Sequence, residues 1–227
     1  MANFNTTYFF DLSSFKHAEL FDGLKQVWEV LNKISPFLQT QTLGNIEVEI
    51  PAGVHIINPE WVSIGRGTIL EPGAYIKGPC LIGDNCTIRH GAYIRGDFIC
   101  GNKCVIGHAT EIKNTLMLNE AHAAHFAYLG DSVLGNKVNL GAGTKCANLK
   151  FDNSNIVIVV QNQKINTGMR KFGAIIGDYT QIGCNAVTNP GTLLGKKVLC
   201  YPCFSFGGFI PSGSRVKPDT KVIITET

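Results

Sequence analysis

An aliphatic residue recurs at every sixth position through the middle of this chain. From Ile64 onward nine of ten such positions are isoleucine or leucine, and only Cys100 departs: they are Ile64, Leu70, Ile76, Ile82, Ile88, Ile94, Cys100, Ile106, Ile112 and Leu118. An α-helix repeats every 3.6 residues and a lone strand every two, so neither gives this spacing. The six-residue repeat therefore constrains the fold more than any other feature of the sequence.

A small or β-branched residue lies two positions before most of these aliphatics, and glycine often follows them, as at Gly65, Gly83, Gly101 and Gly107. Each unit of six residues is expected to form one short strand and a tight turn, with both apolar positions pointing inward. Three units close a triangular coil of about 18 residues that buries its apolar face against neighbouring coils. Coils stack at the strand spacing of about 4.8 Å. The repeat predicts an all-β fold, a parallel β-helix, from about Trp61 onward.

The repeat is broken twice. After Leu118 the next aliphatic in phase is Leu134, so the spacing slips, and the two histidines His122 and His125 fall within this slip. After Cys146 a non-repeat segment extends to Ile176, and within it residues 155–166 alternate like a β-hairpin. The resumed pattern comprises Leu134, Leu140 and Cys146, and then Ile176, Ile182, Leu194 and Cys200.

The first 60 residues follow a different pattern. Apolar residues at helical spacing predict a short helical appendage over about 13–35, with Trp28 in its core and Pro36 as its stop: they are Leu24, Val27, Trp28, Leu31 and Ile34. An extended lead-in, residues 46–50, follows. We therefore expect an appendage with its lead-in (1–55), a β-helix (56–216, with an inserted loop at about 149–172) and a polar, loosely held tail (217–227).

Composition excludes several classes of protein. A net charge of +3 is too small to indicate nucleic-acid binding, and no apolar run is long enough for a membrane helix. No signal peptide is recognisable, so a cytoplasmic protein is expected. Most of the eight cysteines occupy repeat positions that favour a small buried residue. Cys86 and Cys104 are placed to stack on adjacent coils, but a disulfide is not favoured without a secretion signal.

Two sets of polar residues suggest chemistry. Arg95 and Lys113 each follow an inward aliphatic and are expected to stack on adjacent coils, pointing outward. Like charges that close repel unless an anion lies between them, so the pair is either a phosphate clamp or two solvated cations. His125, placed where the repeat slips and near Tyr128, suits general-base catalysis near neutral pH.

Four motifs between Arg95 and Thr144 resemble the acetyltransferase half of the bifunctional bacterial enzyme that makes UDP-N-acetylglucosamine. That family carries Arg-Pro-Gly, Glu-x-Lys, Gly-His-x-x-Tyr-Leu-Gly-Asp and Asn-Ile-Gly-Ala-Gly-Thr. The corresponding segments here are Arg95-Gly96-Asp97, Glu111-Ile112-Lys113, His125-Phe-Ala-Tyr-Leu-Gly-Asp131 and Asn139-Leu-Gly-Ala-Gly-Thr144. The insertion that follows is similar to archaeal-type sugar-1-phosphate nucleotidylyltransferases, which carry the same acetyltransferase module. The resemblance implies that the β-helix is left-handed.

The resemblance also implies residue roles. Lys171 would join Arg95 and Lys113 in holding the sugar phosphate, and Tyr128 and Asn139 would contact the sugar. His125 would take the proton of the 2-amino group, and Asn148 would orient the histidine or the acetyl carbonyl. An amide N–H within Gly141–Gly143 is a candidate oxyanion donor. The residues expected along acetyl-CoA, the substrate and sole cofactor, are Ala142, Cys184 and Pro202.

No metal is expected, because a thiolate leaves without metal assistance. The family implies a homotrimer whose sites lie between subunits.

This chain departs from the family pattern in three places. Leu149 replaces an aromatic residue after the asparagine, which can alter the acyl pocket, and Ala124 replaces the glycine before the histidine. The first 60 residues contain no glycine-rich nucleotide-binding start. We therefore expect the chain to supply acetyl transfer alone, and a separate nucleotidyltransferase partner could dock on the appendage.

The expected function is acetyl-CoA-dependent N-acetylation of a hexosamine 1-phosphate, foremost glucosamine 1-phosphate, in UDP-N-acetylglucosamine synthesis. One alternative is an acyl-carrier-protein-dependent sugar-nucleotide O-acyltransferase, which shares the fold and a similar stretch around a catalytic histidine. A second is a γ-class carbonic anhydrase, disfavoured because the histidine spacing for zinc is missing. A third is a non-catalytic hexapeptide scaffold subunit, since fold alone does not determine function.

Overall fold

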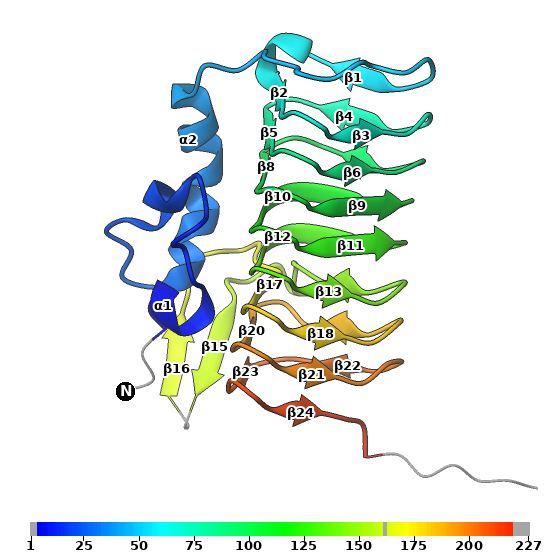
Figure 1. Cartoon of the computed structure of the whole chain (residues 1–227). Coiled ribbons are helices and arrows are strands. Elements are labelled where there is room, and N and C mark those ends of the chain that lie inside the picture. The colour runs from blue at the N-terminus through cyan, green and yellow to red at the C-terminus, as the bar shows by residue number, and fades with distance from the viewer. Residues whose placement is uncertain (1–3, 161–162, 220–227) are drawn as a thin grey trace, which may run out of the picture.

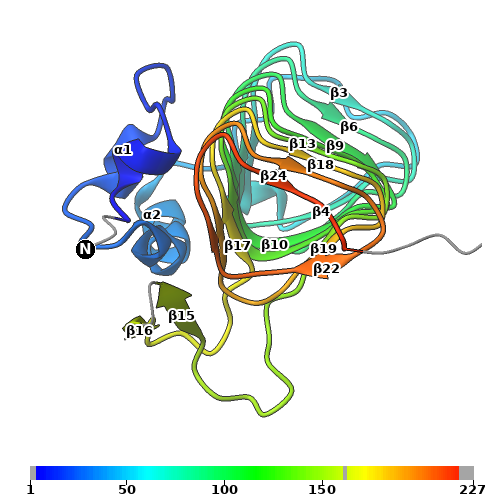
Figure 2. The same ribbon diagram turned by 90° about the horizontal axis from the view of Figure 1, so that it is seen from below.

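In the computed structural model, which describes residues 4–160 and 163–219, about nine coils stack into a parallel β-helix with three faces (Figure 1). Viewed along its axis the β-helix is triangular, and the N-terminal helices lie against one side (Figure 2). The first face contains β1 (His55–Ile57), β4 (Tyr75–Lys77), β7 (Tyr93–Ile94), β10 (Glu111–Met117), β12 (Tyr128–Leu134), β14 (Lys145–Cys146), β19 (Val187–Thr188) and β22 (Ser205–Phe206).

Strands β10 and β12 are long enough to turn a corner and so belong to the second face as well. That face also contains β2 (Val62–Ile64), β5 (Cys80–Ile82), β8 (Phe98–Cys100), β17 (Ala174–Ile176), β20 (Thr192–Leu194) and β23 (Phe209–Ile210). The third face is a separate sheet of β3 (Ile69–Leu70), β6 (Thr87–Ile88), β9 (Val105–His108), β11 (His122–His125), β13 (Asn139–Leu140), β18 (Gln181–Ile182), β21 (Leu199–Cys200) and β24 (Arg215–Val216). The predicted fold class is confirmed.

The six-step positions form the interior of the β-helix. Ile76, Ile94 and Ile112 are fully buried, and they are register partners on successive coils. Glycine is required after several of them because the next coil lies too close for a side chain. A Cβ built on Gly107 would lie 1.6 Å from the carbonyl oxygen of Ala124. Aliphatic side chains therefore fill the interior, and in the turns the backbone of one coil packs directly against the backbone of the next.

The expected inward position of Leu118 is wrong by one residue. Met117 is the register partner of Cys100 and Leu134 and belongs to the interior core. Leu118 is buried on the outside, in the core shared with the appendage. The corner between the first and second faces is therefore shortened, because Met117 follows Ile112 by five positions instead of six.

The appendage consists of short helices rather than one continuous helical segment. It contains α1 (Thr6–Phe9), the 3₁₀ helices η1 (Ala18–Phe21) and η2 (Val27–Asn32), and α2 (Ile34–Thr40), while a further 3₁₀ helix, η3 (Pro59–Trp61), precedes β2. The expected stop at Pro36 is wrong, since Pro36 is the third residue of α2. Amides in the first turn of a helix have no intrahelical partner, so proline is tolerated there.

The appendage and the second face share an apolar core. Trp28 is 2% exposed, as expected for a core residue, and its ring centroid lies 6.3 Å from that of Phe172. The outward residues Ile99, Leu116, Leu118, Val133, Ile175 and Leu193 of the second face belong to this core. The predicted hairpin is confirmed as β15 (Val157–Val160) and β16 (Gln163–Asn166), and Ile156 and Ile158 pack into the same core.

Polar contacts also hold the appendage, at the corner between the second and third faces. The backbone amide of Asp11 donates to Asp178 Oδ2 (2.7 Å), and Asn136 Nδ2 donates to the Asp11 carbonyl (2.8 Å). One coil away, Asn119 Nδ2 donates to the Ser14 carbonyl (3.0 Å). No helix within the described residues is long and apolar enough to cross a membrane. Of the predicted tail, residues 220–227 lie outside the described residues.

Candidate active site

The candidate site lies where the corner between the first and second faces is irregular. Two successive coils are short there, since Met117 follows Ile112 and Leu134 follows Leu129 by five positions. In the next coil the inserted segment leaves the same corner and returns to β17. We call this the shortened corner, formed by residues 95–97, 113–115 and 130–132 and by the base of the insertion, residues 147–149 and 171–173. The slip expected between Leu118 and Leu134 is therefore two single-residue deletions that stack on each other.

Short polar residues form the tight turns of this corner. Asp97, Asn114 and Asp131 have positive φ angles of 49°, 42° and 49°. Asp and Asn tolerate this left-handed conformation better than most residues because their short side chains can hydrogen-bond locally. The same turns aim polar side chains at one another, so the deletions bring functional groups together.

Asp131 is the centre of a polar network at the shortened corner. The ammonium nitrogen of Lys113 lies 2.8 Å from Asp131 Oδ2, and Asn114 Nδ2 donates to Oδ1 at 2.9 Å. The side-chain amide of Asn148 also donates to Oδ2. The side chains of Asp131 and Lys113 are only 6% and 18% exposed. A buried carboxylate needs such donors, because removing it from water is costly unless it is paired.

Tyr128 lies against this network from the first face. Its hydroxyl and the Asn148 side-chain amide both lie over Gly130. A Cβ built on Gly130 would lie 2.5 Å from Asn148 Nδ2 and 2.7 Å from the Tyr128 hydroxyl, so glycine leaves the space these groups occupy. Burial, with Glu111 and Asp131 nearby, raises the pKa of Tyr128 above its ordinary 10.0. The phenol is therefore a neutral hydrogen-bond donor at physiological pH.

Arg95 and Lys113 stack as expected, but they do not face each other as unpaired cations. The Arg95 amide donates to Ile112 O (2.9 Å), which places the two residues on adjacent coils. Each cation has its own carboxylate, since Arg95 Nη1 lies 2.7 Å from Glu111 Oε1 and Lys113 contacts Asp131. Their mutual repulsion therefore does not require an anion. The Arg95–Glu111 pair is half-exposed, whereas the Lys113–Asp131 pair is mostly enclosed.

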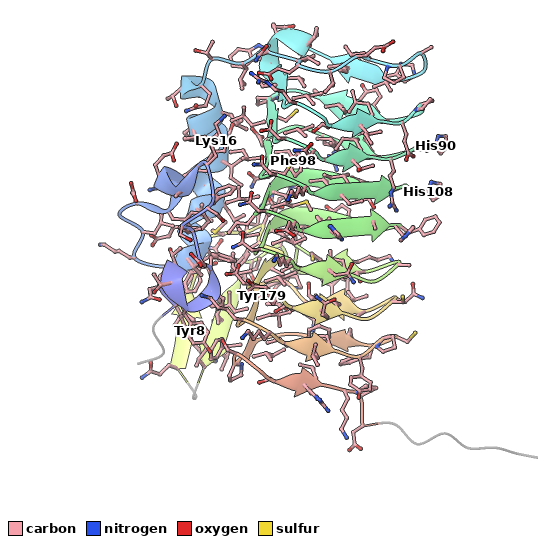
Figure 3. The ribbon with its side chains drawn as sticks, in the orientation of Figure 1. Tyr8, Lys16, His90, Phe98, His108 and Tyr179 are labelled. Atoms are coloured by element: carbon pink, nitrogen blue, oxygen red, sulfur yellow. The ribbon has the colours of Figure 1, made fainter. Side chains whose placement is uncertain are left out.

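His125 lies at a different corner, between the third and first faces, which we call the histidine corner (residues 90, 108, 125 and 126). The expectation that the histidines fall in the slip is wrong, because β11 pairs regularly with β9 and β13. His125 is exposed, and its register partner is His108. The rings of His90 and His108 stack at 5.8 Å with an interplanar angle of 13°, and both lie at the edge away from the appendage (Figure 3).

The three residues expected along acetyl-CoA form a column that continues the histidine corner. The Gly143 amide donates to the His125 carbonyl (3.0 Å), Asn185 N donates to Ala142 O (2.7 Å), and Cys203 N donates to Cys184 O (2.9 Å). A Cβ on Gly183 would lie 2.5 Å from Pro202 N, which places Pro202 on the next coil. His125, Ala142, Cys184 and Pro202 therefore lie along one edge, on successive coils.

Asn139 and Lys171 are the remaining predicted residues. Asn139 lies on the third face as the register partner of His122, not beside Tyr128 on the first face. Exposed Lys171 bridges to Leu149 at the base of the insertion, where Phe172 N donates to Asn148 O (2.9 Å). The chain thus brings together Arg95, Lys113, Tyr128 and Asn148 with the base of the insertion, and keeps His125 and Asn139 apart from them.

Asp131 is the residue that sequence reasoning missed. It ends the Tyr-Leu-Gly-Asp motif, but the resemblance to the acetyltransferase family implied no role for it. Its signal was positional, because it lies 17 residues before Asn148, the spacing of one shortened coil. Among the described residues, the single group of three potential metal ligands is Cys86, Cys100 and Cys104.

Comparisons with known proteins agree with the motifs. A family model for the GMPPB C-terminal domain matches residues 76–157. A bifunctional sugar-1-phosphate nucleotidylyltransferase/acetyltransferase from Sulfurisphaera tokodaii is 36% identical over 72% of this chain and 39% of its own length. A bifunctional protein GlmU from Methanococcus aeolicus is 31% identical over 74% of this chain and 40% of its own. The resemblance inferred from the sequence is confirmed.

The chain spans about two fifths of the length of these curated relatives. Among solved structures, the Arabidopsis UDP-N-acetylglucosamine acyltransferase covers 75% of this chain and 69% of its own, with 12% identity and a TM-score of 0.45. That likeness is too distant to inform function. The acetyltransferase kinship expected from the motifs therefore rests on the sequence relatives.

Proposed function

We propose that this chain is an acetyl-CoA-dependent N-acetyltransferase that acts on a hexosamine 1-phosphate, with glucosamine 1-phosphate as the expected acceptor in UDP-N-acetylglucosamine synthesis. The observation that carries the proposal is the network at the shortened corner, in which buried Asp131 and Asn148 are joined by the partly buried Lys113, with Tyr128 beside them. A β-helix needs no such network for stability, and Lys113, Tyr128 and Asp131 lie in the motifs that resemble the acetyltransferase family.

In this proposal the acceptor phosphate binds at the shortened corner. Arg95 exchanges its half-exposed partner Glu111 for the phosphate, and Lys171 approaches from the base of the insertion. Lys113 keeps its buried partner Asp131 and adds positive charge behind the phosphate. The neutral phenol of Tyr128 donates a hydrogen bond to the sugar, which orients the 2-amino group.

His125 acts as the general base. The ammonium form of the amino sugar has no lone pair, so the amine must lose a proton before it attacks the thioester carbonyl. A positioned base contributes about 10²–10⁴-fold to such a step. The amine nitrogen forms the new C–N bond, the C–S bond breaks, and the coenzyme A thiolate leaves. Asn148 orients the reacting groups from the edge of its network.

The oxyanion donor can be narrowed to one amide. The Gly141 and Gly143 N–H groups, both expected candidates, already donate to Ile182 O and His125 O at 2.7 and 3.0 Å. In the described part of the chain the Ala142 N–H has no hydrogen-bond partner. It lies on the coil next to His125, at the edge where acetyl-CoA is expected. We assign the Ala142 amide as the donor to the tetrahedral intermediate.

A second copy of the chain is needed to complete this site. The histidine corner and the shortened corner bound opposite edges of the first face, and residues 126–130 cross between them. The four steps from residue 126 to residue 130 span about 13 Å in an extended strand, which is too far for His125 to reach an acceptor whose phosphate is held at Lys113. A homotrimer, with His125 or Asn139 facing the shortened corner of a neighbour, would close the gap.

The test is release of free coenzyme A thiol from acetyl-CoA, with mass spectrometry of the acetylated product. Glucosamine 1-phosphate should support release, and galactosamine 1-phosphate in parallel identifies the sugar preference. Turnover only with an acyl-carrier-protein donor would favour the O-acyltransferase alternative. No turnover with any acceptor would favour a non-catalytic scaffold subunit. That alternative would then be tested by measuring whether a separate nucleotidyltransferase binds the appendage.

A further inference from the structure

Three cysteines meet inside the β-helix, away from the candidate active site. Cys86 and Cys104 occupy the small inward position on successive coils, and Cys100 lies across the turn from Cys104. The Sγ atoms of Cys86 and Cys100 are 4.0 Å apart, and all three Sγ atoms lie within 4.8 Å of one another. The three side chains are at most 1% exposed. We call them the cysteine triad.

Cysteine also fills inward repeat positions at Cys80, Cys146 and Cys200, but among the described residues three thiols meet only at the triad. Cys100 is the one position among ten where the six-step series lacks an aliphatic, and that exception falls beside the two cysteines of the neighbouring column. Met117, the register partner of Cys100 on the next coil, is also fully buried. Three thiols and a thioether thus occupy an interior otherwise filled mainly by aliphatic side chains.

The spacing of the sulfur atoms suits a metal ion. Three sulfurs bonded to one ion at about 2.3 Å in a plane lie about 4.0 Å from each other. The Cys86–Cys100 separation already has this value, so small rotations of side chains would complete the site. Thiolate and thioether donors select soft ions such as Cu(I). Within the described residues no histidine or carboxylate joins the cluster, which disfavours harder ions.

We propose that Cys86, Cys100 and Cys104 form a three-coordinate structural site for a soft metal ion of the Cu(I) class in the interior of the β-helix. The site is separate from the acyl-transfer chemistry. Each thiol that becomes a metal-bound thiolate gives one proton to solvent, so uptake increases with pH. Cys86 Sγ donates to the Gly101 carbonyl (3.2 Å) and Cys104 Sγ donates to the Leu118 carbonyl (3.0 Å), and these are the protons that metal binding would release.

Because the triad is enclosed, the ion is expected to enter as the chain folds. The test refolds the full chain anaerobically with Cu(I), removes loosely bound metal by desalting and measures copper per chain by mass spectrometry. The exposed thiols Cys184 and Cys203 are first replaced in a Cys184→Ala/Cys203→Ala background, so that surface cysteines bind no copper. We expect one copper ion per chain and X-ray absorption showing three sulfur neighbours.

The matched variants separate the triad from other buried cysteines. Cys86→Ala, Cys100→Ala and Cys104→Ala should each abolish retention, while Cys80→Ala and Cys146→Ala, buried in the same interior, should retain one copper ion. Circular dichroism of the metal-free variants verifies folding, and Cys→Ser replacements serve where alanine prevents it. No retained copper in the parent, or equal retention in all variants, would overturn the proposal.

Discussion

The side-chain amide of Asn148 donates a hydrogen bond to Asp131 Oδ2, the same oxygen that the ammonium group of Lys113 contacts. Asn148 begins the inserted segment, and Lys113 and Asp131 belong to the two shortened coils. One carboxylate oxygen thus joins the two irregularities of the repeat. The site exists because these irregularities fall at the same corner.

Asp131→Asn should weaken both stability and activity, because it leaves the buried ammonium of Lys113 without a counter-charge. Breaking one partner of a buried pair costs on the order of 3 kcal/mol. Chemical denaturation measures this loss. Glu120→Gln, in the exposed Lys137–Glu120 pair (3.8 Å), is the control and should change stability by less than about 1 kcal/mol. Equal effects of the two substitutions would contradict the central place of Asp131.

Gly130→Ala should reduce turnover without changing any charge. The new methyl group would displace the Asn148 amide and the Tyr128 hydroxyl, which lie 2.5 and 2.7 Å from its position. A displacement of about 1 Å in an active site costs about 10²-fold in rate. Steady-state kinetics of thiol release measures the loss. A Gly130→Ala protein that folds and has wild-type kcat would show that these two groups need no fixed position.

Tyr128 should titrate later than an ordinary tyrosine. Burial is the main cause of its raised pKa, and the neutral phenol is favoured in the folded state. Its stabilising contribution is therefore full below pH 10 and is lost as pH rises through the higher folded-state pKa. Difference absorbance between the parent and Tyr128→Phe isolates this phenol. If the absorbance change that is lost in Tyr128→Phe titrates at or below pH 10, the phenol does not lie in a buried environment.

His17 should make the appendage sensitive to mild acid. Burial between Phe15 and Phe37 lowers its pKa below 6.5. The unfolded chain then binds a proton before the folded one does, so stability is full above pH 6.5 and declines towards the lowered folded-state pKa. Thermal unfolding at pH 7.5 and 5 should differ more for the parent than for His17→Gln. An identical difference would show that other groups control the acid response.

Trp28→Ala should loosen the base of the insertion as well as the appendage, because Trp28 packs against Phe172, next to Lys171. Removing a buried aromatic side chain costs about 3–5 kcal/mol. Hydrogen exchange should quicken over residues 149–160 and 163–172 together with residues 4–40. Trp61→Ala is the matched control, since Trp61 is 42% exposed. Faster exchange confined to the appendage would contradict the coupling to Lys171.

The repeat predicted the interior of the β-helix well, because its inward positions are buried by neighbouring coils alone. It failed at Leu118, where Leu116, Met117 and Leu118 are all fully buried. The appendage covers the outer face of this strand, so both faces are apolar and alternation no longer identifies the inward residue. Without knowledge of the appendage, the deletion could not be located from spacing.

The site was predicted in its parts and not in its arrangement. Arg95, Lys113, Tyr128 and Asn148 were identified by motif, and the structure brings them to one corner. The pairing of each cation with a carboxylate was missed, because Glu111 and Asp131 contact them through coil stacking and corner geometry. The distance of His125 from this corner was also missed. The motifs do not show that His125 lies at the corner between the third and first faces, while Lys113 and Asp131 lie at the corner between the first and second faces.

The central claim is tested most directly by the pH dependence of thiol release in His125→Ala and its matched control. His90→Ala removes an exposed imidazole from the same corner two coils away. The account predicts a loss of about 10²-fold or more at neutral pH for His125→Ala, partly recovered as pH rises and more of the amine is free, with His90→Ala unchanged. Full activity of His125→Ala with glucosamine 1-phosphate, or no thiol release by the parent protein, would contradict it.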